Sequence, residues 1–166
     1  MSAVSASDAI VRLRDGDLTS WNGLPAGTEP ADLEPAIDAP GDAPAMAGIG
    51  LRKALVRFGQ LAGTELDAEV WVSPESAEVW LVAIADPPFA GAPEHVLQQL
   101  GQPALRLDNA LGTVPLPGSE WVYPDRGLAV FADEEDGRVW RVALFTPCRP
   151  EEYEERYRVV LGQRRR

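Results

Sequence analysis

The feature that most constrains this chain is a segment that occurs twice. Residues 70–87 (VWVSPESAEVWLVAIADP) and residues 130–147 (VFADEEDGRVWRVALFTP) align without a gap at a distance of about sixty residues, with about seven identities in about eighteen positions. In each copy, two apolar runs with strand-like alternation flank a polar turn. The turn of the second copy contains Asp136-Gly137, a residue pair that tight hairpins favour. The repeat therefore predicts two similar β-hairpins.

Helical patterns precede each predicted hairpin, so the chain divides into two halves of the same order. Residues 1–88 and residues 89–166 each fit short helices followed by antiparallel strands. The expected helices are residues 7–13, 28–37 and 93–100, and a C-terminal helix that begins at Pro150. The expected strands are residues 52–61, 68–72, 78–85, 120–123, 127–132 and 138–145. This order predicts an α+β fold of two tandem units that share one core.

Three segments are less regular in pattern. Residues 38–50 are rich in Pro, Gly, Ala and Asp, so we expect a mobile loop or linker there. Residues 104–118 are expected to be irregular. Residues 52–61 fit either a strand or a helix, and we favour a strand because the segment precedes the first hairpin.

Alternation along the strands assigns side chains to the two faces of the sheet. One face is expected to form the core beneath the helices, with Trp80 and Trp140 beside Val82, Ile84, Val142 and Leu144. The opposite face then collects Trp71, Val79, Leu81, Phe131, Val139 and Arg141.

Aromatic side chains beside an arginine are typical of protein-binding surfaces when they are exposed. The predicted partner-binding residues on this opposite face are Trp71, Leu81, Phe131 and Arg141. Two alternatives remain at this point: a sheet buried on both sides, and a homodimer formed through this face.

The charge of the chain narrows the kinds of partner. Lys and Arg number 15 against 26 Asp and Glu, which gives a formal net charge of −11. Such a field repels nucleic acid and anionic membranes and favours a protein partner with a basic face, although it also serves solubility alone. There is no long apolar run and no signal-like N-terminus, and Cys148 is the only cysteine. We therefore expect a cytoplasmic protein.

No arrangement of residues in the sequence predicts catalysis. His95 is the only histidine and is expected to face solvent, and Cys148 is expected to be half-buried and inert. One His and one Cys do not make a zinc site. Residues 133–136 are acidic, but their spacing does not match a calcium-binding EF-hand, and the glycines form no phosphate-binding motif. The sequence predicts no catalytic residues, no cofactor and no metal.

Residues 91–103 resemble the opening of the SmpA/OmlA (BamE-like) repeat. The run Gly91-x-Pro93-x-x-Val96-x-x-x-Leu100-Gly101-x-Pro103 is similar to the family's glycine-led helix that ends in Leu-Gly-x-Pro. The residues similar to the family's strands are Trp121-Val-Tyr123, Gly127-Leu-Ala-Val and Asp136-Gly137-Arg138-Val139. The resemblance covers most of residues 90–146, with a degraded copy of the opening at residues 27–33.

Two such units in one chain also resemble the β-lactamase inhibitor proteins, which are built from the same repeat. The resemblance implies a helix-backed antiparallel sheet whose open face binds another protein. This chain has no signal sequence, no lipid-anchoring cysteine near its start and no disulfide pairs. These differences argue against outer-membrane assembly and against secreted inhibition.

The function expected from the sequence is recognition of another protein without catalysis. An immunity or antitoxin-like role is a specific form of this expectation. The alternative is a small-molecule sensor or sequestration protein, with a ligand held between aromatic side chains. An enzyme of unrecognised type ranks third.

Overall fold

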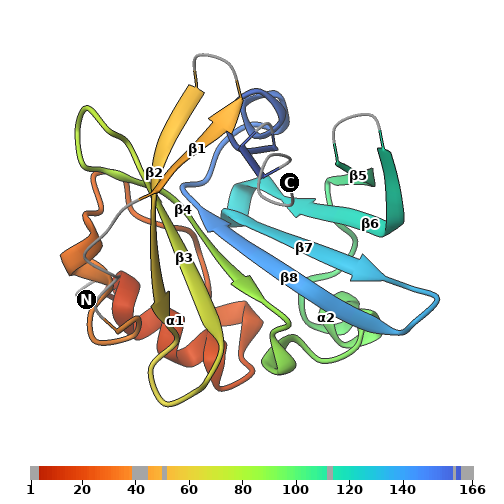
Figure 1. Cartoon of the computed structure of the whole chain (residues 1–166). Helices are drawn as coiled ribbons and strands as arrows, with labels where there is room; N and C mark the ends of the chain where they lie inside the picture. The colour runs from red at the N-terminus through yellow and green to blue at the C-terminus, as the bar shows by residue number, and fades with distance from the viewer. Residues whose placement is uncertain (1–3, 39–44, 50–51, 112–113, 159, 162–166) are drawn as a thin grey trace.

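The computed structural model describes residues 4–38, 45–49, 52–111, 114–158 and 160–161, and it confirms the predicted α+β class (Figure 1). Within these residues, eight strands form one antiparallel sheet in the order β1-β2-β3-β4-β8-β7-β6-β5. The strands are β1 (Ala45–Ile49), β2 (Arg52–Gln60), β3 (Asp67–Val72), β4 (Val79–Ala85), β5 (Leu105–Leu111), β6 (Val114–Tyr123), β7 (Leu128–Asp133) and β8 (Arg138–Phe145). The last strands of the two halves, β4 and β8, therefore pair at the centre.

The two predicted hairpins are both present and have corresponding registers. Trp71 of β3 pairs with Leu81 of β4, and Phe131 of β7 pairs with Arg141 of β8, each sixty residues further along. A β-bulge lies at the corresponding place in each hairpin, just after Trp71 and just after Phe131. At the centre of the sheet, Ala83 pairs with Ala143. The two hairpins are therefore placed symmetrically about this central pair.

One face of the sheet, here called the inner face, packs against the helices that precede the hairpins. These elements are α1 (Ala6–Arg14), α2 (Pro93–Leu100) and the short 3-10 turns η1 (Leu18–Ser20), η2 (Pro30–Leu33) and η3 (Pro88–Ala90). In Figure 1, α1 lies behind the sheet. The buried side chains of this layer include Ile10, Leu13, Leu33, Val96, Val82, Ile84, Val142 and Leu144. Ser5 caps α1 by accepting a hydrogen bond from the Asp8 amide.

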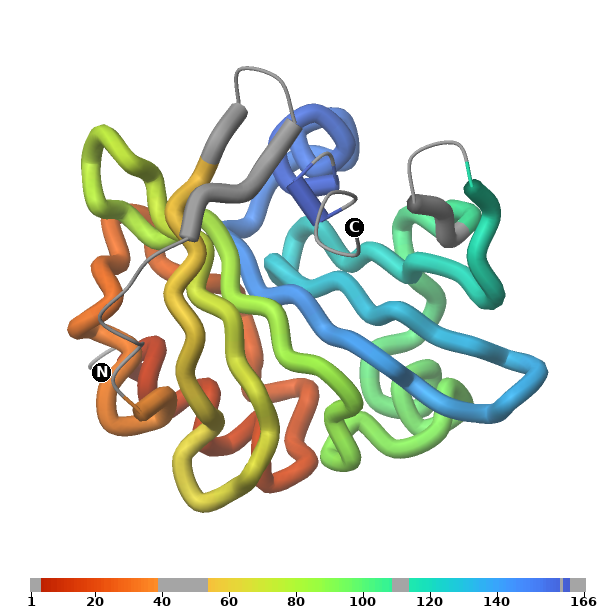
Figure 2. Tube along the Cα trace, viewed as in Figure 1, coloured from red at the N-terminus to blue at the C-terminus, as the bar shows by residue number. Residues whose placement is uncertain are grey.

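The C-terminal segment packs on the other face of the sheet, here called the outer face. It begins as α3 (Pro150–Glu152) and continues as a π-helical turn, η5 (Tyr153–Arg158). A short connection from the end of β8 leads into it (Figure 2). Four of its side chains, Tyr153, Tyr157, Val160 and Leu161, are all buried with outer-face residues such as Trp71, Leu81 and Phe145. Both faces of the sheet are thus covered, at least in part.

The prediction of loop structure over residues 38–50 and 104–118 is wrong for the described parts. Ala45–Ile49 forms β1, while residues 39–44 and residue 50 lie outside the described residues. Leu105–Leu111 forms β5, and β6 begins at Val114. Both β1 and β5 are edge strands. Backbone pairing with one neighbour forms such strands even where the side chains show little strand pattern.

The assignment of Trp80 and Trp140 to the inner face is also wrong. Each tryptophan is the extra residue of a β-bulge, because Val79 pairs with Val72 while Leu81 pairs with Trp71, and the second hairpin repeats this offset. A bulge breaks the strict alternation of side chains. Trp80 and Trp140 therefore pack, partly buried, with the outer-face cluster, and Val79 and Val139 belong to the inner one.

Candidate functional site

Three neighbouring side chains on the outer face form an aromatic–arginine cluster: Phe131, Trp140 and Arg141. The guanidinium carbon of Arg141 lies 4.1 Å from the ring centroid of Phe131 and 5.1 Å from that of Trp140. The two rings lie 5.1 Å apart. These distances permit cation–π attraction, which strengthens when the groups are shielded from water. The bulge makes this possible, because it turns Trp140 and Arg141 to the same side.

The structure brings the four predicted partner-binding residues together on the outer face and buries them. The exposed fractions are 1% for Trp71, 0% for Leu81, 2% for Phe131 and 4% for Arg141. The expectation that this face is only partly covered is therefore wrong at these four positions, because the C-terminal segment packs there. Whether these residues bind a partner stays a prediction.

Sequence reasoning missed two outer-face residues that do reach solvent. Trp140 is partly exposed, and Phe58 of β2 is 53% exposed. Phe58 pairs with Glu69 and lies two residues after Val56, which packs in the outer cluster. The alternation of Val56 and Phe58 along the predicted strand was a signal that could have placed Phe58 on this face.

A buried carboxylate links the outer face to the C-terminal segment. Glu120 of β6 is 3% exposed and pairs with Phe131. The hydroxyl of Tyr153 donates to its Oε1, and Nε of Arg158 donates to its Oε2 at 2.9 Å. A second Arg158 nitrogen donates to the carbonyl of Asp108 at 2.9 Å. Burial, and then the adjacent Glu120, raise the pKa of Tyr153 well above its usual value, so the phenol is a neutral donor.

The corresponding place in the first half of the sheet is apolar. There, Val56, Trp71 and Leu81 are neighbours across β2, β3 and β4. In the second half, Glu120, Phe131 and Arg141 are neighbours across β6, β7 and β8. The same sheet geometry thus carries an apolar row in one half and a row with two charged residues in the other.

His95 and Cys148 occupy structural positions. Nε2 of His95 lies 2.5 Å from the Gln99 side-chain nitrogen, which also donates to the Gly16 carbonyl at 3.0 Å. His95 is half-buried in this contact, so the expectation that it faces solvent is only partly met. Burial, followed by the charge of Glu152, raises the pKa of Cys148 to about 11. At neutral pH this thiol is protonated and a poor nucleophile.

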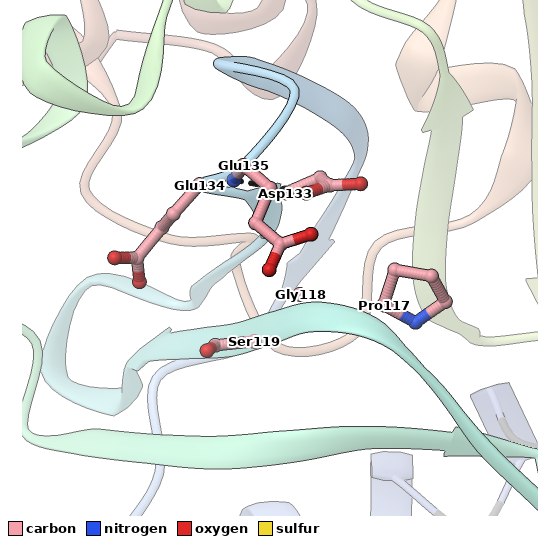
Figure 3. A pocket seen from close by; sticks show the side chains of 6 residues that line it. All are labelled: Pro117, Gly118, Ser119, Asp133, Glu134 and Glu135. Carbon is pink, nitrogen blue, oxygen red and sulfur yellow. Dashed lines mark hydrogen bonds between the residues drawn. The ribbon is translucent and has the colours of Figure 1, made fainter.

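The acidic hairpin turn forms one wall of a cavity of about 480 Å³ (Figure 3). Its lining consists of Pro117, Gly118, Ser119, Asp133, Glu134 and Glu135. The Asp133 carboxylate accepts hydrogen bonds from the amides of Glu135 and Asp136, which stabilises the turn itself. Among the described residues, no group of three or more His, Cys, Asp or Glu side chains is placed to hold a metal ion.

A second cavity, of about 370 Å³, lies between η2 and β2. Its lining includes Arg57, Glu29, Glu34 and Val72. The Nε of Arg57 is buried and has no hydrogen-bond partner in the part of the chain that the structure describes. The side chain of Arg57 thus lines this cavity together with apolar side chains and two carboxylates.

Comparisons of the chain with protein-family models, with curated proteins and with solved structures found no match. The resemblance of residues 90–146 to the SmpA/OmlA repeat stays a prediction. Within the described ranges, no helix has the length and apolar character that a membrane crossing requires.

Proposed function

We propose that this chain is a non-enzymatic binding protein that recognises another protein through the outer face of its sheet. The observation that carries the proposal is the aromatic–arginine cluster, in which the partly exposed Trp140 lies against Arg141 and Phe131. Trp, Tyr and Arg dominate the energetically important residues of protein interfaces. Trp140 is partly exposed to solvent, and its ring packs against Phe131 and Arg141.

The charge around Trp140 indicates the chemistry of the partner. The turn that joins β7 to β8 carries exposed Glu134, Glu135 and Asp136, close in sequence to Trp140. The whole chain has a net charge of −11. A partner with a basic face would be attracted to this surface, and complementary charge speeds association. An immunity or antitoxin-like role, in which an acidic protein masks a basic one, is a specific form of this proposal.

A duplicated architecture is part of the proposal. The equal register of the two hairpins, their matching bulges and the central pairing of Ala83 with Ala143 support two tandem units that share one sheet. The two units differ in the row of charged side chains, which lies in the second half.

The exposure of each side chain decides which variants suit the test. Replacement of buried Trp71 or Arg141 would disturb packing, whereas Trp140→Ala and Phe58→Ala remove side chains that reach solvent. Val4→Ala is a matched control, because Val4 is 46% exposed and precedes α1. In affinity capture from cells that produce the protein, we expect a partner whose recovery falls at least tenfold with Trp140→Ala and is unchanged with Val4→Ala. Equal recovery with all variants would contradict the proposal.

A second candidate function is supported by the cavity at Arg57. Its volume falls within the range of small-molecule sites, and the positive charge of Arg57 in its lining would attract a carboxylate or phosphate group. A thermal-shift screen of small anionic metabolites tests this candidate, because a ligand that binds the folded state raises its melting temperature. A shift that is present in the wild type and absent in Arg57→Leu would support it, and the absence of any shift would contradict it.

A further inference from the structure

The C-terminal segment, of which residues 150–158 and 160–161 are described, satisfies a buried charge on the outer face. Each carboxylate oxygen of Glu120 accepts a hydrogen bond from this segment, one from the Tyr153 hydroxyl and one from Arg158. A buried carboxylate without donors is strongly unfavourable. If the segment leaves, Glu120 therefore requires replacement donors, from water or from another molecule.

The sheet itself does not require this charge. The corresponding position in the first half is held by Val56, which is 3% exposed and packs in the same outer cluster. Replacing a buried ion pair by apolar side chains is often neutral or stabilising. The presence of Glu120 at this place is thus better explained by recognition than by stability.

The outer face also holds a buried donor that no described residue satisfies. The indole nitrogen of Trp71 is buried there and donates to no acceptor among the described residues, although Trp71 is only 1% exposed. Buried donors without partners are uncommon in folded proteins. In addition, Tyr153–Arg158 is wound as a π-helix, a rare form that is frequent at functional sites.

We propose that the C-terminal segment is an intramolecular cover that a basic amphipathic helix of the partner protein displaces. Such a helix would bring an arginine and a hydroxyl donor to Glu120 and an aromatic ring to Phe145, as Arg158, Tyr153 and Tyr157 do in the covered state. This inference rests on the proposed function, because it names how the partner reaches the outer face.

Charge indicates the chemistry of the partner's helix. The cover exposes Glu151, Glu154 and Glu155 on a molecule whose net charge is −11. A helix with basic residues at these outward positions is attracted to such an acidic molecule. Because the cover is covalently joined to β8, its effective concentration at the outer face is high. The partner's helix must therefore gain enough binding free energy from charge and contacts to compete with the cover.

A labelled peptide tests this exchange on the full-length chain. The peptide has the sequence of residues 149–161 with Glu154→Lys and Glu155→Lys, and its binding is measured by fluorescence anisotropy. The chain is either wild type or Tyr157→Ala, which removes the ring that lies 4.7 Å from Phe145 and so loosens the cover. We expect at least tenfold tighter binding to the Tyr157→Ala chain. A matched peptide that also carries Arg158→Ala should bind at least tenfold more weakly.

Equal affinity for both chains, or an affinity that does not depend on Arg158 of the peptide, would overturn the inference. If the Tyr157→Ala chain fails to fold, hydrogen exchange of the wild-type chain decides. The amides of Tyr153–Arg158 should then exchange at least a hundredfold faster than those of β8, through local opening. Exchange at the same rate as β8 would overturn the inference. If these tests fail while affinity capture still depends on Trp140, the inference that the C-terminal segment is a displaceable cover is wrong. The proposed function would then still stand.

Discussion

At the scale of single residues, Gly127 is the point where three parts of the chain meet. Its carbonyl accepts hydrogen bonds from the Trp21 indole at 3.1 Å and from the Phe145 amide at 2.9 Å. It follows the 3-10 turn η4 (Pro124–Arg126) with a φ of +61°, in the left-handed region. A Cβ atom added there would overlap the carbonyl oxygen of Phe145. Glycine is thus required both by conformation and by the close approach of β8.

We predict that Gly127→Ala destabilises the protein much more than Gly27→Ala. Gly27 has a φ of +80°, but a Cβ there would have no atom within 4 Å. The conformational cost of about 1–2 kcal/mol is common to both variants, and overpacking adds about 1–3 kcal/mol for Gly127 alone. Urea unfolding monitored by circular dichroism measures both free energies. Equal losses would show that Gly127 is not in close contact with β8.

Tyr153 supports a prediction on pH. Burial raises its folded-state pKa well above 10.0, so above pH 10 the unfolded chain releases a phenol proton that the folded chain keeps. The stabilisation that comes from this raised pKa is complete below pH 10, and it is lost as the pH rises toward the folded-state pKa. The free energy of unfolding should therefore fall above pH 10, by at most about 1.4 kcal/mol per pH unit for this group.

The comparison with Tyr153→Phe isolates this group. Burial also raises the pKa of Tyr123, to about 12, so some decline remains in the variant. We expect a shallower decline between pH 10 and pH 11.5 for Tyr153→Phe than for the wild type, measured by urea unfolding at each pH. Parallel curves would mean that Tyr153 is not buried against Glu120.

At the scale of elements, the two hairpins use the same turn with different residues. Ala77 has a φ of +61° in the first hairpin, and Gly137 has a φ of +64° at the corresponding place in the second. An L-residue other than glycine is strained in this region. The first hairpin therefore accommodates a conformation for which the second has the better residue.

Exchanging these residues should change stability in opposite directions. We predict that Ala77→Gly stabilises the protein by about 0.5–1 kcal/mol. The substitution relieves about 1–2 kcal/mol of backbone strain, and the larger entropy of glycine in the unfolded chain offsets part of this gain. Gly137→Ala should destabilise the protein by about 1 kcal/mol through backbone strain alone, since a Cβ there meets no atom within 4 Å. Denaturant midpoints of the two variants provide the measurement. Changes of the same sign would argue against equivalent turns.

The strands and helices with strong side-chain patterns could be predicted from the sequence, and the edges and faces could not. The strands β2, β3, β4, β7 and β8 and the helix α2 lie close to their expected positions. The strands β1 and β5 form by backbone pairing with one neighbour, so their amino-acid composition does not identify them as strands. The bulges that turn Trp80 and Trp140 to the outer face cannot be recognised from the hydrophobic periodicity.

The sequence predicts which residues of the candidate site share one face, but it does not predict that they are buried. Alternation alone places Trp71, Leu81, Phe131 and Arg141 on one face, as the structure has them. The amphipathic pattern of the C-terminal helix indicates that it packs against the rest of the chain, but it does not indicate which face of the sheet it covers. Docking of that helix on the outer face depends on the buried contact of Tyr153 and Arg158 with Glu120, which joins residues far apart in sequence.

At the scale of the whole molecule, one sheet joins two halves of similar geometry and different chemistry. The first half carries an apolar row at Val56, Trp71 and Leu81, and the second carries Glu120, Phe131 and Arg141. The second half also carries the acidic hairpin turn and the partly exposed Trp140. The second half therefore carries most of the features on which the proposed recognition surface rests.

Photo-crosslinking from position 140 in living cells is the decisive test of recognition through the outer face. Benzoylphenylalanine is placed at Trp140, which is partly exposed, and, as the control, at Val4, which is exposed but precedes α1. We expect one dominant crosslinked protein with a basic surface from position 140, and none of that protein from position 4. A chain that crosslinks to nothing from position 140, or to the same proteins from both positions, would contradict recognition through the outer face.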